Sequence, residues 1–378
     1  MGAIDWDRRL FDELIPLPDG TSYNAYLVRG SEKTALIDTA DPAKSEEILA
    51  QLDDVERLDV LIIQHVEQDH SGSAPLIVER YPDVQIVSSP KAAPMIADHL
   101  GIPEDRITAV EDGETLSLGD RTLEFIHAPW VHWPETMLTY LREERILFTC
   151  DLFGSHLATN ELFAGDRPRV CEASKRYFAE IMMPFSGLIK GHLEKLAPYE
   201  IEMICPSHGP IHDDPGFILD AYRHWVLDPP KNLVLLPYTS MHDSTRRMVD
   251  HLVAALTERG VHVERFHLSK IDLGEYATHL VDAATVIFAT PTVLVGPHPS
   301  IIPVAYLTAA LRPKLRYAGV IGSFGWAGQA AERTQNLCAN LKADWFEPVF
   351  TKGLPKEETF VALDALADEI AARHKELD

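Results

Sequence analysis

The chain has few cysteines, no long apolar run and little positive charge, and each shortage excludes a class of protein. Its 378 residues include four cysteines, which are widely separated and form no CxxC pair. That usage disfavours a disulfide framework or a thiolate metal site and fits reduced thiols in a cytoplasm. The longest apolar runs fall short of the ~20 residues that a membrane-spanning helix needs, and the N-terminus carries no apolar signal core.

Acidic residues outnumber basic ones by 58 to 34, which gives a formal net charge of -24. Such a surface argues against nucleic acid and anionic membranes as partners. The remaining composition, 46% hydrophobic and 24% charged, is typical of a globular protein. A chain of this length exceeds one ordinary domain, so two are expected.

One stretch, from His65 to His70, concentrates the side chains that bind metals. His65, Glu67, Asp69 and His70 lie within it, directly after the apolar run 60–63 that predicts a buried strand. Imidazoles together with carboxylates suit first-row transition metals. A polar loop with two chance histidines is the alternative.

Three further candidates, His132, Asp151 and His208, also follow apolar runs. Polar residues at strand ends are the usual functional positions of an α/β scaffold. Taken singly, Asp151 fits a helix N-cap and His208 a turn residue. The prediction of a metal site therefore depends on the whole set.

In the first half, interleaved elements predict a sandwich of sheets covered by helices. Strands are expected at 21–28, 33–39, 60–63 and 84–88 and between 107 and 148, with helices at 44–52, 74–81 and 90–100. The double proline at 229–230 predicts the boundary between a domain 1–229 and a domain 230–378.

The second half predicts βαβ repeats and hence a parallel sheet with helices on both faces. Strands are expected at 232–237, 261–267, 285–289, 316–321 and 343–348, with helices at 245–259, 301–310, 327–341 and 360–374. Ligands of such sheets bind at the carboxyl ends of the strands. Three loops, at 238–245, 290–297 and 322–328, fall there. The first, rich in hydroxyls before a helix, suits a phosphate, and a planar ring fits between the other two.

The first half resembles the metallo-β-lactamase fold, an αββα sandwich, and in particular its diiron branch, the flavodiiron proteins (A-type flavoproteins). The resemblance rests on the 65–70 stretch with Glu67, on the later His, Asp and His, and on the phrases at 21–26, 132–134, 151–154 and 206–209. It implies one iron held by His65, Glu67 and His132, a second held by Asp69, His70 and His208, and a bridge through Asp151.

The second half resembles the flavodoxin domain, which implies bound FMN. The implied contacts are Thr239, Ser240, Met241, His242, Asp243, Ser244, Thr245, Pro291, Thr292, Val293, Leu294, Val295, Ser323, Phe324, Gly325, Trp326, Ala327 and Gly328. Two features depart from the flavodoxin pattern. His242-Asp243 stands where the phosphate loop usually has Gly or Asn, and the second loop lacks asparagines after its threonine. A flavodoxin-like domain without cofactor is the alternative.

The resemblance implies an oxidoreductase that reduces dioxygen to water, nitric oxide to nitrous oxide, or both. A zinc hydrolase with an appended flavodoxin-like domain and an electron carrier with a relic first domain are the alternatives, which Glu67 and the full ligand set disfavour. His127, His156 and His212, near the ligands in sequence, are either supporting donors or ordinary histidines.

Two expectations concern partners. The chain lacks the paired CxxC of an appended rubredoxin, so a separate donor is expected, either a rubredoxin-like protein or a reduced deazaflavin coenzyme. The resemblance also implies a head-to-tail homodimer or a dimer of dimers, with Trp326 near the partner's metal site.

Overall fold

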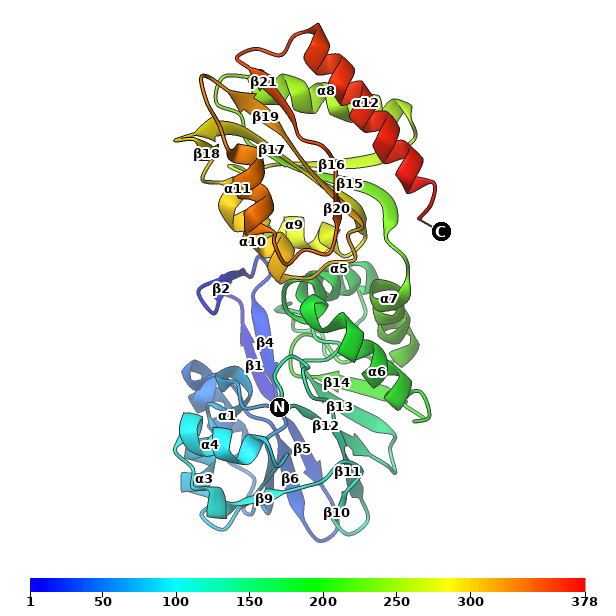
Figure 1. Ribbon diagram of the computed structural model, residues 1–378. Coiled ribbons are helices and arrows are strands. Elements are labelled where there is room, and N and C mark those ends of the chain that lie inside the picture. The colour runs from blue at the N-terminus through cyan, green and yellow to red at the C-terminus, as the bar shows by residue number, and fades with distance from the viewer. Residues whose placement is uncertain (378) are drawn as a thin grey trace. The chain divides into compact units, whose positions relative to one another are not determined.

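The computed structural model describes residues 1–377, which fold into two compact units. The first is Met1–Val226 and the second begins at Leu227 (Figure 1). This division lies three residues before the one that the sequence predicts, because helix α7 (Pro215–Leu227) runs up to it. The double proline follows the end of that helix, where a chain can no longer continue helically.

Two five-stranded sheets form the centre of the first unit. One has the order β5 (Tyr26–Arg29), β6 (Thr34–Ile37), β7 (Val60–Ile62), β8 (Gln85–Ser88) and β9 (Ile107–Ala109). The other has the order β10 (Thr115–Ser117), β11 (Thr122–His127), β12 (Met137–Leu141), β13 (Ile146–Cys150) and β14 (Met203–Pro206). Two small ribbons, β1 (Gly2–Asp5) with β4 (Thr21–Asn24) and β2 (Leu10–Phe11) with β3 (Ile15–Pro16), complete the strands.

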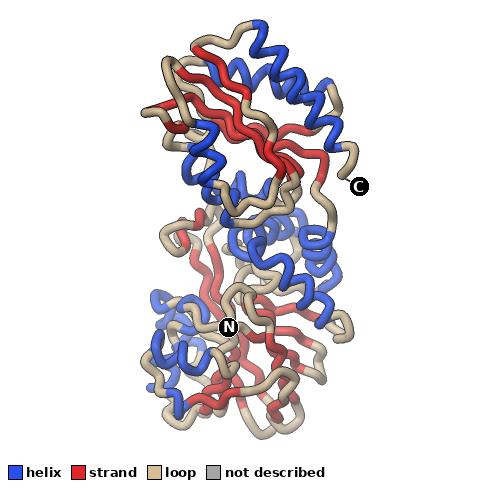
Figure 2. Tube along the Cα trace, viewed as in Figure 1, coloured by secondary structure: helices blue, strands red, loops and turns tan. Residues whose placement is uncertain are grey.

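The two sheets face each other across an apolar core. Ile37 and Ile62 on one sheet and Phe125 and Phe148 on the other belong to a single buried cluster. Helices α1 (Ser45–Gln51), α3 (Ala74–Arg80) and α4 (Ala92–Leu100) cover the outside of the first sheet, and α5 (Arg167–Tyr177), α6 (Ser186–Leu196) and α7 lie outside the second (Figures 1 and 2). The predicted αββα sandwich is confirmed.

Two details of this unit differ from the sequence prediction. The strand expected at 21–28 is interrupted at Ala25, because β4 pairs with β1 whereas β5 pairs with β6. The sequence analysis also identified no element between Asp151 and β14, where α5 continues through a π-helical turn (Phe178–Met182) and a 3-10 turn (Met183–Phe185) into α6.

The second unit is built on a parallel sheet in the order β16 (His262–His267), β15 (Lys231–Tyr238), β17 (Ala283–Val293) and β19 (Tyr317–Phe324), with β20 (Asp344–Trp345) and β21 (Val349–Lys352) both pairing with β19. This is the flavodoxin-like order, in which the chain adds strands first on one side of β15 and then, from β17 onward, on the other. The doubly wound sheet is thus as predicted.

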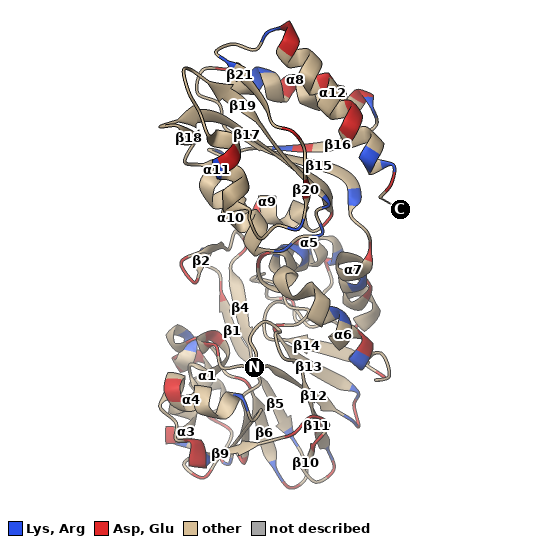
Figure 3. Cartoon of the chain, viewed as in Figure 1, with Lys and Arg blue, Asp and Glu red and all other residues tan. Residues whose placement is uncertain are grey.

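Helices cover both faces of this sheet. α8 (Ser244–Glu258) and α12 (Glu357–His374) lie on one face, and α9 (Leu273–Leu280), α10 (Ile301–Ala310) and α11 (Ala330–Leu337) on the other (Figure 1). Acidic and basic side chains line α8 and α12 (Figure 3), and two pairs join these helices: Arg259 with Asp368, and His251 with Asp364. No helix within residues 1–377 is both long and apolar enough to cross a membrane.

Three elements of the second unit depart from expectation. α9 was not predicted. The helix expected at 327–341 is the shorter α11, because residues 325–329 form a loop. The last strand, expected at 343–348, is only β20, and the longer edge strand β21 follows Pro348.

Candidate metal centre and cofactor cleft

All seven predicted metal ligands come together at one end of the sandwich, where strands end and loops begin. His65 and Glu67 follow β7, and Asp69 and His70 lie on the single-turn helix α2 (Gln68–Ser71). The other three lie at equivalent points of the second sheet: His132 between β11 and β12, Asp151 directly after β13, and His208 after β14. The rigid strand ends fix the positions of these side chains, although the ligands span 143 positions of sequence (208 − 65).

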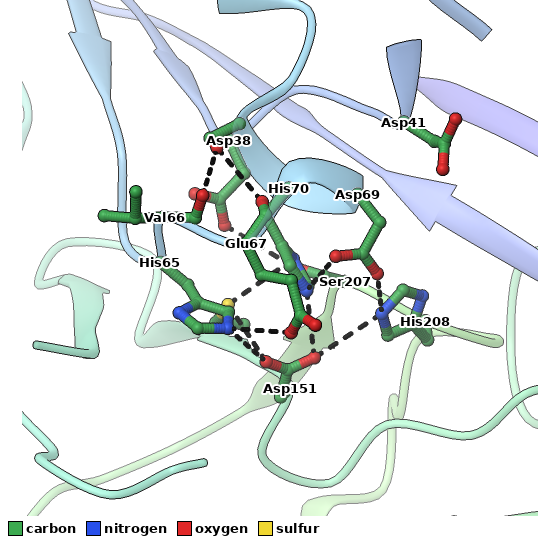
Figure 4. Close-up of polar contacts among 12 residues, drawn as sticks. Asp38, Asp41, His65, Val66, Glu67, Asp69, His70, Asp151, Ser207 and His208 are labelled. Carbon is green, nitrogen blue, oxygen red and sulfur yellow. Dashed lines mark hydrogen bonds and ion pairs between the residues drawn. The ribbon is translucent and has the colours of Figure 1, made fainter. Parts of the chain in front are cut away.

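Asp151 lies between two pairs of imidazoles. Figure 4 shows it with three of them, His65, His70 and His208. Its Oδ2 atom is 3.6 Å from His65 Nε2 and 4.0 Å from His132 Nε2. Its Oδ1 atom is 3.1 Å from His70 Nε2 and 3.4 Å from His208 Nε2. Each oxygen of this carboxylate therefore faces its own pair, which is the arrangement expected of a bridge between two metal ions.

One terminal carboxylate completes each half of the group. Glu67 Oε2 lies 3.2 Å from His65 Nε2 and 3.0 Å from His132 Nε2. We call this set, His65, Glu67 and His132, position A. The corresponding set on the other side of Asp151 is called position B and consists of Asp69, His70 and His208.

At position B, buried polar atoms approach one another without forming hydrogen bonds. Asp69 Oδ1 is 3.4 Å from His70 Nε2, and Asp69 Oδ2 is 3.1 Å from His208 Nε2. Yet both carboxylate oxygens and His70 Nε2 have no hydrogen-bond partner within residues 1–377. Buried polar atoms without partners are costly, and a cation at the point to which they converge would satisfy them. The residues therefore fit a metal, and their nitrogen and oxygen donors suit a first-row transition ion.

The electrostatics of the pocket favour positive charge. Burial lowers the pKa of His208, but Asp151 and Asp69 more than reverse this and raise it to about 10. Burial likewise raises the pKa of Asp151, but His70 and His208 hold it well below its usual range. The carboxylates thus remain ionised and attract a cation, whether a proton or a metal ion.

Hydrogen bonds from a second layer orient the imidazoles. The Nδ1 atom of His65 is 2.7 Å from Glu135 Oε1, that of His208 is 2.6 Å from the carbonyl oxygen of Ser22, and that of His70 is 3.5 Å from Cys150 Sγ. Each ring therefore directs its Nε2 atom toward the centre. Such partners set the tautomer and orientation of metal-binding histidines.

The sequence analysis missed several residues of this second layer. Glu135 had a local signal, since it lies three positions after His132 in the same loop. Tyr177, which donates a 2.7 Å hydrogen bond to Asp151 Oδ1 from α5, had none. Asp12, between β2 and β3, was missed too. Burial and the neighbouring Glu67 and Asp69 raise its pKa, which places it beside the group.

The three additional histidines have different environments. His156 is buried beside the centre, with its ring 5.0 Å from that of His208 and its Nδ1 atom 2.9 Å from Thr21 Oγ1. His212 is bonded to the carbonyl of Phe153, and burial lowers its pKa to about 4. His127 is bonded to the carbonyl of Val110 and, within residues 1–377, shares no hydrogen bond with a ligand.

A cleft in the second unit opens at the carboxyl ends of its strands. Its walls come from the three predicted loops and from Gly353. The loop residues in the walls are Ser240, Met241, His242, Ser244, Thr245, Pro291, Thr292, Ser323, Phe324, Gly325 and Trp326. Thr245 Oγ1 and Ser323 Oγ, 3.2 Å apart, join two of the loops. The Oγ1 atom of Thr292 is buried and has no partner within residues 1–377, so the cleft offers an unused polar group. Together with the N-terminus of α8, these groups fit a phosphate-bearing ligand such as FMN.

Asp243 does not obstruct this cleft. Its backbone adopts a φ of 62°, and its carboxylate pairs with Arg246 Nε at 2.9 Å, outside the cleft wall. The departure from the flavodoxin phosphate loop is therefore accommodated by turning the acidic side chain toward a cation.

Several other residues implied as FMN contacts do not line the cleft. Val293 ends β17, and the chain turns at Leu294 and Val295 into β18 (Gly296–Pro297), which leaves Leu294 91% exposed. Thr239 is instead bonded to Ser300 Oγ at 2.9 Å. Ala327 and Gly328 are likewise absent from the wall.

The comparisons with known proteins agree with both units. Residues 21–209 match the model of the ODP family beta lactamase. The chain is 34% identical to a nitric oxide reductase of Moorella thermoacetica over 99% of this chain and 96% of that protein, and 31% identical to a coenzyme F420H(2) oxidase of Methanocaldococcus jannaschii over 100% and 95%.

Solved structures match over the whole chain as well. The rubredoxin oxygen:oxidoreductase of Desulfovibrio gigas has a TM-score of 0.94 at 31% identity, covering 99% of this chain and 96% of that one. The flavodiiron protein of Giardia intestinalis has a TM-score of 0.92 at 27% identity, covering 100% and 94%.

The fold and the site thus define an oxidoreductase that joins a dinuclear metal centre to a flavodoxin-like unit. The chain belongs to the flavodiiron protein family.

Proposed function

We propose that this flavodiiron protein reduces dioxygen to water, nitric oxide to nitrous oxide, or both, with iron at positions A and B and FMN in the cleft of the second unit. The observation that carries the proposal is Asp151, whose two oxygens face two equivalent ligand sets. When bound, the flavin supplies electrons singly and the two irons bind and reduce a small ligand.

Each metal position of such a centre has its own set of protein ligands. Two imidazoles and one carboxylate would hold each iron, and Asp151 would join the two positions. These four protein donors per iron leave room for a diatomic ligand. Position B is buried, whereas the side chains of His132 and Glu67 are 19% and 12% exposed. A small ligand would therefore approach from the side of position A.

Glu67 favours this function over zinc-dependent hydrolysis. An anionic oxygen donor is harder than an imidazole and stabilises ferric iron. The zinc hydrolase is the competing proposal, and metal analysis separates the two. We expect about two irons per chain for the reductase, whereas zinc in place of iron would refute it.

Activity assays complete this test. Iron- and FMN-replete protein with a chemical donor should consume anaerobic nitric oxide, dioxygen, or both, and Asp151→Ala should abolish turnover. Asp41→Ala is the matched control, because Asp41 is a nearby carboxylate that stands apart from the ligand group (Figure 4). If the replete protein turns over neither gas, the reductase proposal is wrong.

We propose that electrons come from a separate donor, either a rubredoxin-like protein or a reduced deazaflavin coenzyme. Support comes from the names of similar proteins, a rubredoxin oxygen:oxidoreductase and a coenzyme F420H(2) oxidase. We also place the protein in the cytoplasm, in agreement with its four free cysteines. Reduction of bound FMN by each donor, followed spectrophotometrically, would identify the donor.

We further propose a head-to-tail homodimer, alone or paired as a dimer of dimers, in which the flavin unit of one subunit serves the metal centre of the other. Support comes from Trp326, which borders the cleft and is 87% exposed. Coexpression of Asp151→Ala with a Ser244→Glu and Ser323→Glu double variant should restore part of the activity, because a mixed dimer contains one intact pair. Inactive mixed dimers in which each chain keeps its surviving cofactor would contradict the arrangement.

A further inference from the structure

The first layer of the metal centre is balanced between positions A and B, but the second layer is not. Each position has two imidazoles and one terminal carboxylate, and Asp151 is shared. Behind position A, His65 Nδ1 is bonded to the Glu135 carboxylate at 2.7 Å. Behind position B, the partners are uncharged groups: the Cys150 thiol for His70 and the Ser22 carbonyl for His208.

Glu135 is a buried carboxylate that accepts two hydrogen bonds at position A. The residue is only 2% exposed, and its Oε1 atom lies 2.7 Å from His65 Nδ1. The backbone N–H of Val66 donates a second hydrogen bond at 3.1 Å. A carboxylate behind an imidazole raises the basicity of that ligand, so it donates more electron density to its metal. At position B, the groups behind the two imidazoles are a thiol and a backbone carbonyl.

Tyr177 acts on the bridge in the same direction. Its hydroxyl donates a 2.7 Å hydrogen bond to Asp151 Oδ1, the oxygen that faces His70 and His208. A hydrogen bond to a carboxylate oxygen draws electron density from it and weakens it as a donor. The contact therefore makes position B poorer in electrons, whereas Glu135 makes position A richer.

Asp38 is a further buried carboxyl beside the centre. It accepts hydrogen bonds from the backbone N–H and the side-chain amide of Gln64 at 2.8 and 2.9 Å, with the Ser207 hydroxyl at 3.4 Å. Within residues 1–377 no imidazole donates a hydrogen bond to it. Asp38 therefore does not act on a ligand as Glu135 acts on His65.

We propose that these contacts make the two iron positions electronically unequal, so that position A holds the ferric ion and position B the ferrous ion when the centre contains one of each. The proposal rests on the proposed function only in taking iron as the metal. Starting from two ferric ions, the first electron from a reductant enters position B at the higher potential. The second enters position A at the lower potential, and both irons are then ferrous.

Two variants test this assignment, one behind position A and one at the bridge oxygen that faces position B. The test is an anaerobic redox titration of protein with two irons per chain, in which electron paramagnetic resonance follows the half-reduced centre. Glu135→Gln removes the charge behind position A but keeps an oxygen acceptor, so it should raise the lower potential. Tyr177→Phe removes the hydrogen bond to the bridge, so it should lower the higher potential. Each variant should narrow the gap between the two potentials and reduce the maximum of the half-reduced signal at least twofold.

The opposite assignment predicts the opposite result. If position B held the ferric ion, Glu135→Gln would raise the higher potential and Tyr177→Phe would lower the lower one, so the gap would widen. A widened or unchanged gap in the variants overturns the proposal. Tyr222→Phe is the matched control, because this buried hydroxyl accepts from the Phe153 N–H rather than donating to a ligand, and the gap should stay as in the wild type.

Tyr177→Phe decides the question even if Glu135→Gln fails to fold, because the buried Oε2 of Glu135 has no hydrogen-bond partner within residues 1–377 and an amide at that position would lack an acceptor there. Turnover of a gas is not needed for the titration. A protein that loaded two irons but reduced neither gas would refute the proposed function, and the potentials would still decide the assignment.

Discussion

At the residue scale, Asp151 and Glu67 differ in how many metal positions they serve. Asp151 faces both positions, and Glu67 contacts only the two histidines of position A. We therefore expect Asp151→Ala to lose both irons, whereas Glu67→Ala should retain about one iron per chain because position B keeps its three terminal ligands. Elemental analysis of purified variants measures this. Two irons per chain in Asp151→Ala would rule out the bridge.

Thr292 offers a second prediction at this scale. Thr292 lines the cleft, and its buried hydroxyl has no partner within residues 1–377, so it is an uncompensated polar group that a flavin could satisfy. Thr292→Val keeps the shape and removes the hydroxyl. We expect FMN affinity to fall about fivefold, the equivalent of ~1 kcal/mol for one hydrogen bond.

The matched control for Thr292 is Asp243→Asn, because the carboxylate of Asp243 pairs with Arg246 outside the cleft. Fluorescence titration with FMN measures both variants. The assignment of Thr292 as a flavin contact fails if Thr292→Val binds as tightly as the wild type, or if only Asp243→Asn weakens binding.

At the element scale, His374 ties the end of α12 to the sheet. Its Nε2 atom is 2.7 Å from Thr285 Oγ1 on β17, and its Nδ1 atom is 2.8 Å from Asn232 Oδ1 on β15. Burial lowers the pKa of His374 to about 4, whereas an unfolded histidine has a pKa of about 6.5. The unfolded chain therefore binds the extra proton first as the pH falls, and the stabilisation by neutral His374 is present above about pH 6.5 and lost on the way to about pH 4.

Urea unfolding at several pH values tests this linkage. The free energy of unfolding of the second unit should decrease between pH 6.5 and pH 4, and His374→Gln, which has no titrating ring, should show a smaller decrease. An identical dependence on pH in variant and wild type would show that another group is responsible.

At the scale of the whole molecule, the two units have separate cores, and the candidate metal centre and the cleft lie in different units. Metal bound only to the folded state stabilises it by mass action, about 2.7 kcal/mol at 100 times the dissociation constant. Chelation of iron should therefore lower the melting temperature of the first unit by several degrees and leave that of the second unchanged.

Calorimetry of iron-loaded and chelated protein distinguishes these transitions, and FMN removal provides the reciprocal control. It should lower only the transition of the second unit. A single transition that shifts as a whole under either treatment would mean that the units unfold together.

The amino-acid sequence by itself determined the two-unit architecture and the gathering of the seven candidate ligands at one end of the sandwich. Three apolar runs, those before His65, Asp151 and His208, are strands. In each case the local pattern places a polar residue after the carboxyl end of the strand. Strand ends of neighbouring sheets meet at one edge, so local signals sufficed to predict which side chains would gather. The alternation of strands and helices likewise predicted the sandwich and the parallel sheet.

Only the tertiary structure decided which groups stand behind the ligands. Tyr177 reaches Asp151 from a helix that the sequence analysis did not predict, and the Ser22 carbonyl meets His208 from a strand 186 positions away. Such contacts depend on how separate segments pack, and backbone carbonyls and single hydroxyls leave no periodic pattern in sequence from which packing could be read.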